Sequence, residues 1–289
     1  GQNVSPDAEY INACRELLAD TSLDAAMVAL MLQLPSEAYL AEIIHPVDVQ
    51  GIHQAREALR KVLAQALKGE LRACYSRCES DEAYAANAEQ IARRSLKNTA
   101  LAYLMLLEEE QFIALAIQQF ESSANMTDRL AALTYIVNSE SEYKAKALQL
   151  FYQQWQHEPL VINQWFQVQA MCRLAGTLET VQGLMSHPAF DIRNPNKVRA
   201  LIGAFCGQNG VNFHREDGAG YRFLADQVLV LNRSNPQIAS RLLVPLTKWR
   251  KYLPAAQQLM RAELQRVLAE PELSSDVYEV VSKSLQDYS

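Results

Sequence analysis

Apolar residues recur along this chain in steps of three and four, the period of one buried helix face. The longest stripe consists of Ile52, Ala55, Leu59, Val62, Ala66, Leu67 and Leu71. Similar stripes predict helices over 91–107, 112–120, 126–137, 143–155, 160–171, 178–185, 259–268 and 277–285, and after Asn194-Pro195, Gly220 and Asn235-Pro236. No alternating Val/Ile/Thr-rich run with hairpin signals stands out. The pattern predicts an all-α protein.

Residues that cap helices mark several of the expected starts. They are Ser36, Thr127 with Asp128, Ser141 with Glu142, Thr177 with Glu179, and Ser274 with Asp276. Pro46 suits the first turn of the long helix that contains Ile52. The connections are short, which favours antiparallel packing of consecutive helices.

An internal echo indicates repetition. Arg193-Asn194-Pro195 leads into Arg199, and Arg233-Ser234-Asn235-Pro236 leads into Arg241. The two prolines lie 41 residues apart, within the helix-pair period of HEAT and armadillo arrays. We therefore expect residues 1–289 to form one continuous domain, a superhelical array of antiparallel helix pairs (an armadillo/HEAT-like α-solenoid).

Composition fits a globular chain of 289 residues, with 49% hydrophobic and 21% charged residues. No apolar run is long enough to cross a membrane, and no signal peptide is visible at the start. The five cysteines are odd in number and scattered, which suits reduced thiols and predicts a cytoplasmic location. Cys74 and Cys78 share a helix face, where two packed thiols are favoured over a metal site.

The chain carries no His-Glu-x-x-His, Gly-x-Ser-x-Gly, Walker or dinucleotide motif. Its isolated histidines are His45, His53, His157, His187 and His214. Glu57 follows His53 at i+4, but no second ligand is evident, and a structural role is favoured for all five. We predict no catalytic residue, no metal ligand and no cofactor in this segment.

The most glycine-rich segment is 213–221, where Gly218 and Gly220 permit positive φ or close backbone approach before a helix. A lone Gly-x-Gly is weak support for phosphate binding, and Glu216 with Asp217 would repel an anion. A loop leading into a helix is favoured.

Charge is distributed unevenly along the chain. Residues 193–266 contain 12 Lys or Arg against 4 Asp or Glu, whereas the whole chain has a net charge of -6. Solvated helix faces account for most of these cations, and the sequence pI near 5.5 argues against nucleic-acid binding. The third interpretation of the basic stretch is a concave surface that attracts carboxylates. Arg199 and Arg241 are the best candidates for it, because they occupy equivalent places in the two echoing helices.

Ordered strings over nearly the whole chain resemble the C-terminal helical domain of the bacterial aminopeptidase N family, zinc-dependent alanyl aminopeptidases of the gluzincin class. The strings that carry the resemblance are Ile91-Ala92-Arg93-Arg94-Ser95-Leu96-Lys97-Asn98, Asn125-Met126-Thr127-Asp128, Gln164-Trp165-Phe166, Asn194-Pro195-Asn196, Leu201-Ile202-Gly203-Ala204-Phe205, Glu216-Asp217-Gly218 and Asn235-Pro236-Gln237.

The resemblance implies an armadillo-like domain that closes over a catalytic domain of the same polypeptide and walls the cavity that peptide substrates enter. It places Arg199 and Arg241 facing that cavity, and it assigns the zinc and the hydrolase activity to the parent enzyme. We expect this segment alone to be inactive and to bind neither nucleic acid nor membrane. The alternative is a free-standing helical-repeat scaffold that binds a protein or peptide. The resemblance further suggests that the first helices of the family's domain are missing or shortened, which would leave apolar residues without their usual cover, namely Ala26, Met27, Leu30 and Met31.

Overall fold

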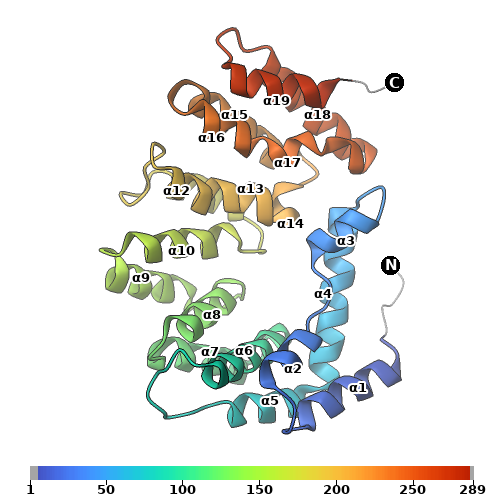
Figure 1. Ribbon diagram of the computed structural model, residues 1–289, viewed down its shortest axis with the longest axis vertical. Coiled ribbons are helices and arrows are strands. Elements are labelled where there is room, and N and C mark those ends of the chain that lie inside the picture. Colours follow the sequence, from blue (N-terminus) through green and yellow to red (C-terminus); the bar gives the residue numbers. More distant parts are fainter. Residues whose placement is uncertain (1–5, 287–289) are drawn as a thin grey trace. The chain divides into compact units, whose positions relative to one another are not determined.

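The computed structural model describes residues 6–286, which are helical except for turns, loops and one isolated bridge between Val47 and Tyr252 (Figure 1). The expected all-α class is confirmed. None of the helices described is long and apolar enough to cross a membrane. The chain divides into two compact units, Gly1–Glu37 with Ile52–Leu150 and Ala38–Gly51 with Phe151–Ser289. The single-domain organisation stays a prediction.

The first unit is built around one central helix, α6, which packs against α2, α5 and α8. Its helices are α1 (Ala8–Ala19), α2 (Ala25–Met31), most of α4 (Val49–Ala66), α5 (Lys68–Arg77), α6 (Ala88–Leu104), η1 (Met105–Leu107), α7 (Glu110–Ser122), α8 (Met126–Val137) and the first part of α9 (Lys144–Trp155). Leu96, Ala100, Leu101 and Leu104 of α6 are all buried, as their helical spacing requires.

The helices of the second unit succeed one another in chain order from α10 to α19 (Figure 1). They are α10 (Pro159–Ala170), α11 (Thr177–Leu184), α12 (Pro195–Val198), η2 (Arg199–Gly203), α13 (Ala204–Gln208), α14 (Gly210–Phe213), α15 (Ala219–Ser234), α16 (Pro236–Leu242), α17 (Val244–Thr247), η3 (Trp249–Lys251), α18 (Pro254–Leu268) and α19 (Ser275–Leu285), with α3 (Glu37–Ile43) nearly all in the same unit. Neighbouring layers pack directly, as α15 does on α16 and α18. This succession is the expected pattern of stacked helix pairs.

Several local predictions need correction. The cap of α8 is Asn125 and not Thr127, and α11 begins after Gly176 with Thr177 as its first residue. Ser274 caps α19 as expected. Pro46 lies before α4, because the segment there pairs Val47 with Tyr252 and the helix begins at Val49.

The buried face of the long helix also differs from the predicted stripe. Ala55 and Val62 are exposed, whereas Leu63 and Ala64 are buried with Ile52. The helix ends at Ala66 and α5 starts at Lys68. Leu67, which precedes α5, and Leu71 within it are both buried in the core. Apolar spacing locates the helix but does not say which of two neighbouring apolar rows is covered.

The apolar residues of α2 form an uncovered surface within the described chain. Met27, Leu30 and Met31 are 55%, 62% and 51% exposed, and Ala26 is exposed beside them. Large exposed apolar patches are typical of interaction sites.

The glycine-rich segment 213–221 is a turn leading into α15. Gly218 adopts φ +66°, which favours glycine. A Cβ on Gly220 would lie 2.2 Å from the carbonyl oxygen of Phe213, so no side chain fits there. Arg215 forms ion pairs with Asp217 in the same turn and with Glu179 of α11. These pairs connect the turn to another helix of the second unit.

Candidate functional site

The two echoing Asn-Pro segments start helices in the same way. The Oδ1 atom of Asn194 accepts from the backbone N–H groups of Asn196 and Lys197 at 3.0 and 3.4 Å. The Oδ1 atom of Asn235 accepts from the backbone N–H of Ile238 at 3.2 Å. A proline follows each cap in the first turn, as expected from the missing proline donor. The sequence echo therefore reflects a structural repeat.

Arg199 begins η2, a five-residue π-helical segment that interrupts the helix between α12 and α13. Such π-helical turns occur frequently at functional sites. A Cβ on Gly203 would lie 3.9 Å from Cβ of Arg199 and 3.8 Å from Cδ2 of Leu242. Gly203 of η2 thus lies close to Leu242, the residue that follows Arg241, so the helices that carry the two arginines approach each other here.

Both guanidinium groups are exposed and neither is held in an ion pair. Nη1 of Arg199 donates to Oδ1 of Asn196 at 2.9 Å, and Arg241 makes no hydrogen bond or ion pair with any residue of the range 6–286. Six of the other ten cations in the basic stretch are paired with carboxylates, namely Arg193, Arg215, Arg233, Lys248, Lys251 and Arg266. Arg199 and Arg241 are therefore available for an anionic partner.

A further cation beside this surface is buried and was not predicted as such. Lys197 is 8% exposed, and its Nζ lies 5.4 Å from the centre of the Phe166 ring. Burial lowers the pKa of Lys197 from its usual value. No signal in the sequence indicated this burial, because it depends on the approach of Phe166 from α10.

Within the described residues, four of the five histidines lie in no group of three metal-ligating side chains. His214 is bonded through Nδ1 to the hydroxyl of Tyr221 at 2.9 Å and not to a backbone carbonyl, and burial lowers its pKa to about 3. His187 accepts a backbone N–H from Ala189 at 3.1 Å, in keeping with a loop role. His45 and His157 are exposed.

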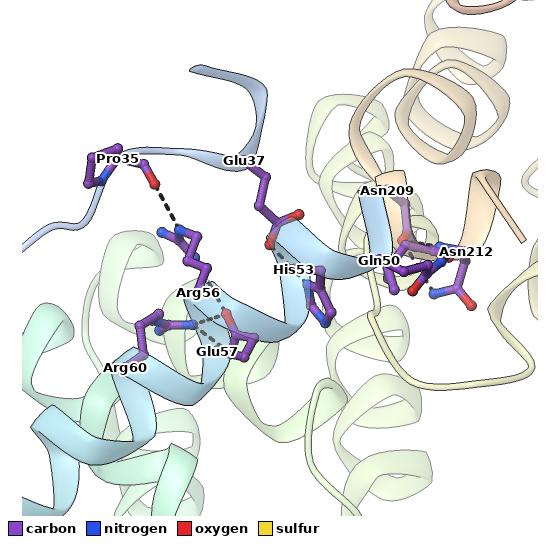
Figure 2. A network of polar contacts seen from close by, with 10 residues as sticks. Pro35, Glu37, Gln50, His53, Arg56, Glu57, Arg60, Asn209 and Asn212 are labelled. Atoms are coloured by element: carbon purple, nitrogen blue, oxygen red, sulfur yellow. Dashed lines mark hydrogen bonds and ion pairs between the residues drawn. The ribbon is translucent and has the colours of Figure 1, made fainter. Parts of the chain in front are cut away.

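The exception is His53, because the fold brings a second acidic residue to it (Figure 2). Nδ1 of His53 lies 3.0 Å from Oε1 of Glu37, and Glu57 follows one turn later on the same helix. One ligand atom from each of the three residues lies within 4.8 Å of those of the other two. The sequence could show only the pair on α4, since Glu37 lies sixteen residues earlier.

All five cysteines are free thiols and buried. Cys74 and Cys78 are hydrogen-bonded to each other, which raises the pKa of Cys74 and lowers that of Cys78. The positive charges of Arg77, Arg93 and Lys97 lower the pKa of Cys78 further. In the described chain these thiols belong to no group of three metal-ligating residues, and the packing interpretation is retained.

Comparison with known proteins adds a family to this geometry. A family model described as "Domain of unknown function (DUF3458_C) ARM repeats" matches residues 1–286. Aminopeptidase N of Escherichia coli (strain K12) is 40% identical over 285 residues, which are 99% of this chain and 33% of that protein. Aminopeptidase N of Caulobacter vibrioides is 37% identical over 279 residues, covering 96% of this chain and 32% of that protein.

A solved structure agrees with these sequence matches. The crystal structure of Legionella pneumophila aminopeptidase A in complex with aspartic acid superposes with a TM-score of 0.90 at 31% identity, covering 99% of this chain and 34% of that one. The chain spans about a third of the length of the relatives it matches, and it corresponds to the C-terminal portion of aminopeptidase N proteins. The chain belongs to the DUF3458_C family of ARM-repeat domains.

Proposed function

We propose that this chain is the non-catalytic domain of a zinc aminopeptidase, which removes N-terminal residues from peptides, and that it walls the substrate cavity of that enzyme. The observation that carries this proposal is the match of nearly the whole chain to the C-terminal third of aminopeptidase N proteins. The same match favours a domain of a larger enzyme over a free-standing scaffold. The five buried free thiols are consistent with work in the cytoplasm.

The catalytic zinc belongs to the remainder of the parent polypeptide in this proposal. The gluzincin class holds it with a His-Glu-x-x-His helix, and the 289 residues contain no such motif. His214 is buried against Tyr221, and His45 and His157 are exposed on separate segments, so these side chains do not supply that pair. The metal would activate water at the parent's site, and the residues described in this chain act on substrate access and orientation.

Arg199 and Arg241 are the residues that we assign to substrate attraction. Each is exposed without an ion pair, and they lie on neighbouring helices of a stretch with net positive charge. A guanidinium matches a carboxylate in shape and charge, so the pair would attract the C-terminal carboxylate of a short peptide.

The partner of the domain is the catalytic region of the same polypeptide. The apolar face of α2 supports this, because Met27, Leu30 and Met31 are each more than half exposed in the chain by itself. An apolar face of this kind is stabilised when another surface covers it.

The isolated 289-residue chain is expected to show no aminopeptidase turnover when zinc is added. The full-length polypeptide should hydrolyse an aminoacyl anilide under the same conditions, because it carries the zinc motif. Steady-state release of the anilide product measures both. A turnover by the isolated chain comparable with that of the full-length protein would contradict the proposal that this domain is non-catalytic.

A further inference from the structure

A histidine and two glutamates converge in the first unit. His53 and Glu57 lie one turn apart on α4, and Glu37 comes from the start of α3 (Figure 2). Their ligand atoms lie within 4.8 Å of one another, and all three residues are partly buried. We propose that Glu37, His53 and Glu57 bind a divalent transition-metal ion of the zinc class.

The donor set fits that class of ion. Zinc is bound by imidazole nitrogen and carboxylate oxygen at about 2.0–2.2 Å, often with three protein ligands and a water. Tetrahedral geometry then separates neighbouring ligand atoms by about 3.4 Å. The Nδ1 atom of His53 and Oε1 of Glu37 are already 3.0 Å apart. The remaining separations are at most 4.8 Å, so binding an ion would require them to shorten by up to about 1.4 Å.

The two ring nitrogens of His53 can divide the roles of binding the ion and carrying the ring proton. Nδ1 carries the contact with Glu37, and Nε2 has no hydrogen-bond partner among residues 6–286. The ion would take the place between Nδ1 and the carboxylates. The ring proton would then lie on Nε2, which can donate to water because the His53 side chain is 17% exposed.

Two arginines hold Glu57 in position for this role. Nη1 of Arg60 donates to both carboxylate oxygens of Glu57, at 2.8 and 3.0 Å. Nη1 of Arg56 lies 3.4 Å from Oε1 of Glu57, and its Nε donates to the carbonyl of Pro35 at 2.9 Å. Outer hydrogen bonds of this kind orient carboxylate ligands.

The positive charge of the arginines also sets an upper limit on affinity. Arg56 and Arg60 offset the two carboxylates, so the ion is not attracted by a net negative site. The alternative is an ionic cluster that needs no metal, with His53 bonded to Glu37 and Glu57 bonded to Arg60. The metal site differs from this cluster in one measurable way: it gives saturable binding that depends on His53 and Glu37 together.

The test is zinc titration of the chelator-treated 289-residue chain by isothermal calorimetry. We expect one saturable site, weakened by about 100-fold in His53→Gln and by at least about tenfold in Glu37→Gln. His157→Gln and Glu16→Gln remove an exposed histidine and an exposed glutamate elsewhere and should leave binding unchanged. Zinc should raise the melting temperature of the wild-type chain and of both control variants, and not that of His53→Gln.

Cys78→Ala tests the main competing site, because Cys74 and Cys78 are two neighbouring thiols that could also bind zinc. The proposal requires Cys78→Ala to bind zinc like the wild type, and cobalt in the wild-type site to lack a thiolate-to-cobalt band. Absence of saturable binding in the wild type would overturn it, as would equal affinity in His53→Gln. Loss of binding in Cys78→Ala with retention in His53→Gln would assign the ion to the thiols and overturn it as well. Circular dichroism of each variant confirms that it is folded.

Discussion

Replacing Asp128 with alanine is expected to lower the free energy of unfolding by about 3–5 kcal/mol, because the change leaves the partly buried ammonium group of Lys97 without its anion. Asp128 is 3% exposed at the start of α8. Its Oδ2 accepts from Nζ of Lys97 at 2.5 Å and from Nδ2 of Asn125 at 3.1 Å, and its Oδ1 accepts from Nδ2 of Asn98 at 2.8 Å. Alanine would leave all three donors without their acceptor.

The effect is expected to spread through neighbouring groups that share these hydrogen bonds. Nε2 of Gln119 donates to Oδ1 of Asn98 at 2.8 Å and to the carbonyl of Asp128 at 2.9 Å, and the hydroxyl of Tyr75 donates to Oε1 of Gln119 at 2.9 Å. The network joins α5, α6, α7 and α8, so it ties together the core of the first unit. Networks of this kind are costly when only partly satisfied.

Chemical denaturation of the chain measures this loss, with Asp191→Ala as the matched control. Asp191 also pairs with a cation, Arg193, but the Arg193 side chain is 82% exposed and that of Asp191 is 46% exposed. Exposed pairs contribute about 0–1 kcal/mol. A loss in Asp128→Ala no larger than that in Asp191→Ala would show that the buried network does not stabilise the first unit.

Gly220→Ala should destabilise the second unit by about 3 kcal/mol, at the upper end of the cost of overpacking. The added Cβ would lie 2.2 Å from the carbonyl oxygen of Phe213 and 2.9 Å from its carbonyl carbon. These are backbone atoms, so the turn itself would have to move. The turn carries Phe213, which packs against Phe205 and Tyr221 in the core.

Gly183→Ala is the opposite case and serves as the control. Gly183 lies within α11, and nothing approaches within 4 Å of the position where a Cβ would be added. Alanine there should raise the stability by about 0.5–1 kcal/mol, because glycine costs more chain entropy in a helix. Thermal unfolding of both variants should therefore shift in opposite directions. A shift of the same sign and size in both would contradict the steric account of Gly220.

The period of the apolar residues was sufficient to predict most helices. The stripe over 126–137 coincides with α8, and the stripes over 143–155 and 160–171 match α9 and α10 to within one residue at either end. Caps were less certain, because Asn125 and Thr127 are both good capping residues and only the backbone decides between them. Local signals thus define elements better than their ends.

Long-range packing accounts for what the sequence did not reveal. Asp128 looks like a helix-start acid, and its burial depends on Lys97, 31 residues earlier. Glu37 could not be joined to His53 without the approach of two segments sixteen residues apart. The equivalent placement of Arg199 and Arg241 could be predicted from the sequence, because each follows an Asn-Pro helix start and this start repeats in the fold.

The role of Arg199 and Arg241 is tested most directly by steady-state kinetics of the full-length enzyme. The double substitution Arg199→Ala/Arg241→Ala should raise KM by about tenfold for short peptides with a free C-terminal carboxylate, which corresponds to about 1.4 kcal/mol of lost binding. KM for a matched peptide amide or an aminoacyl anilide, which lack that carboxylate, should be nearly unchanged, and so should kcat. An equal change in KM for both kinds of substrate would contradict the carboxylate role assigned to this surface.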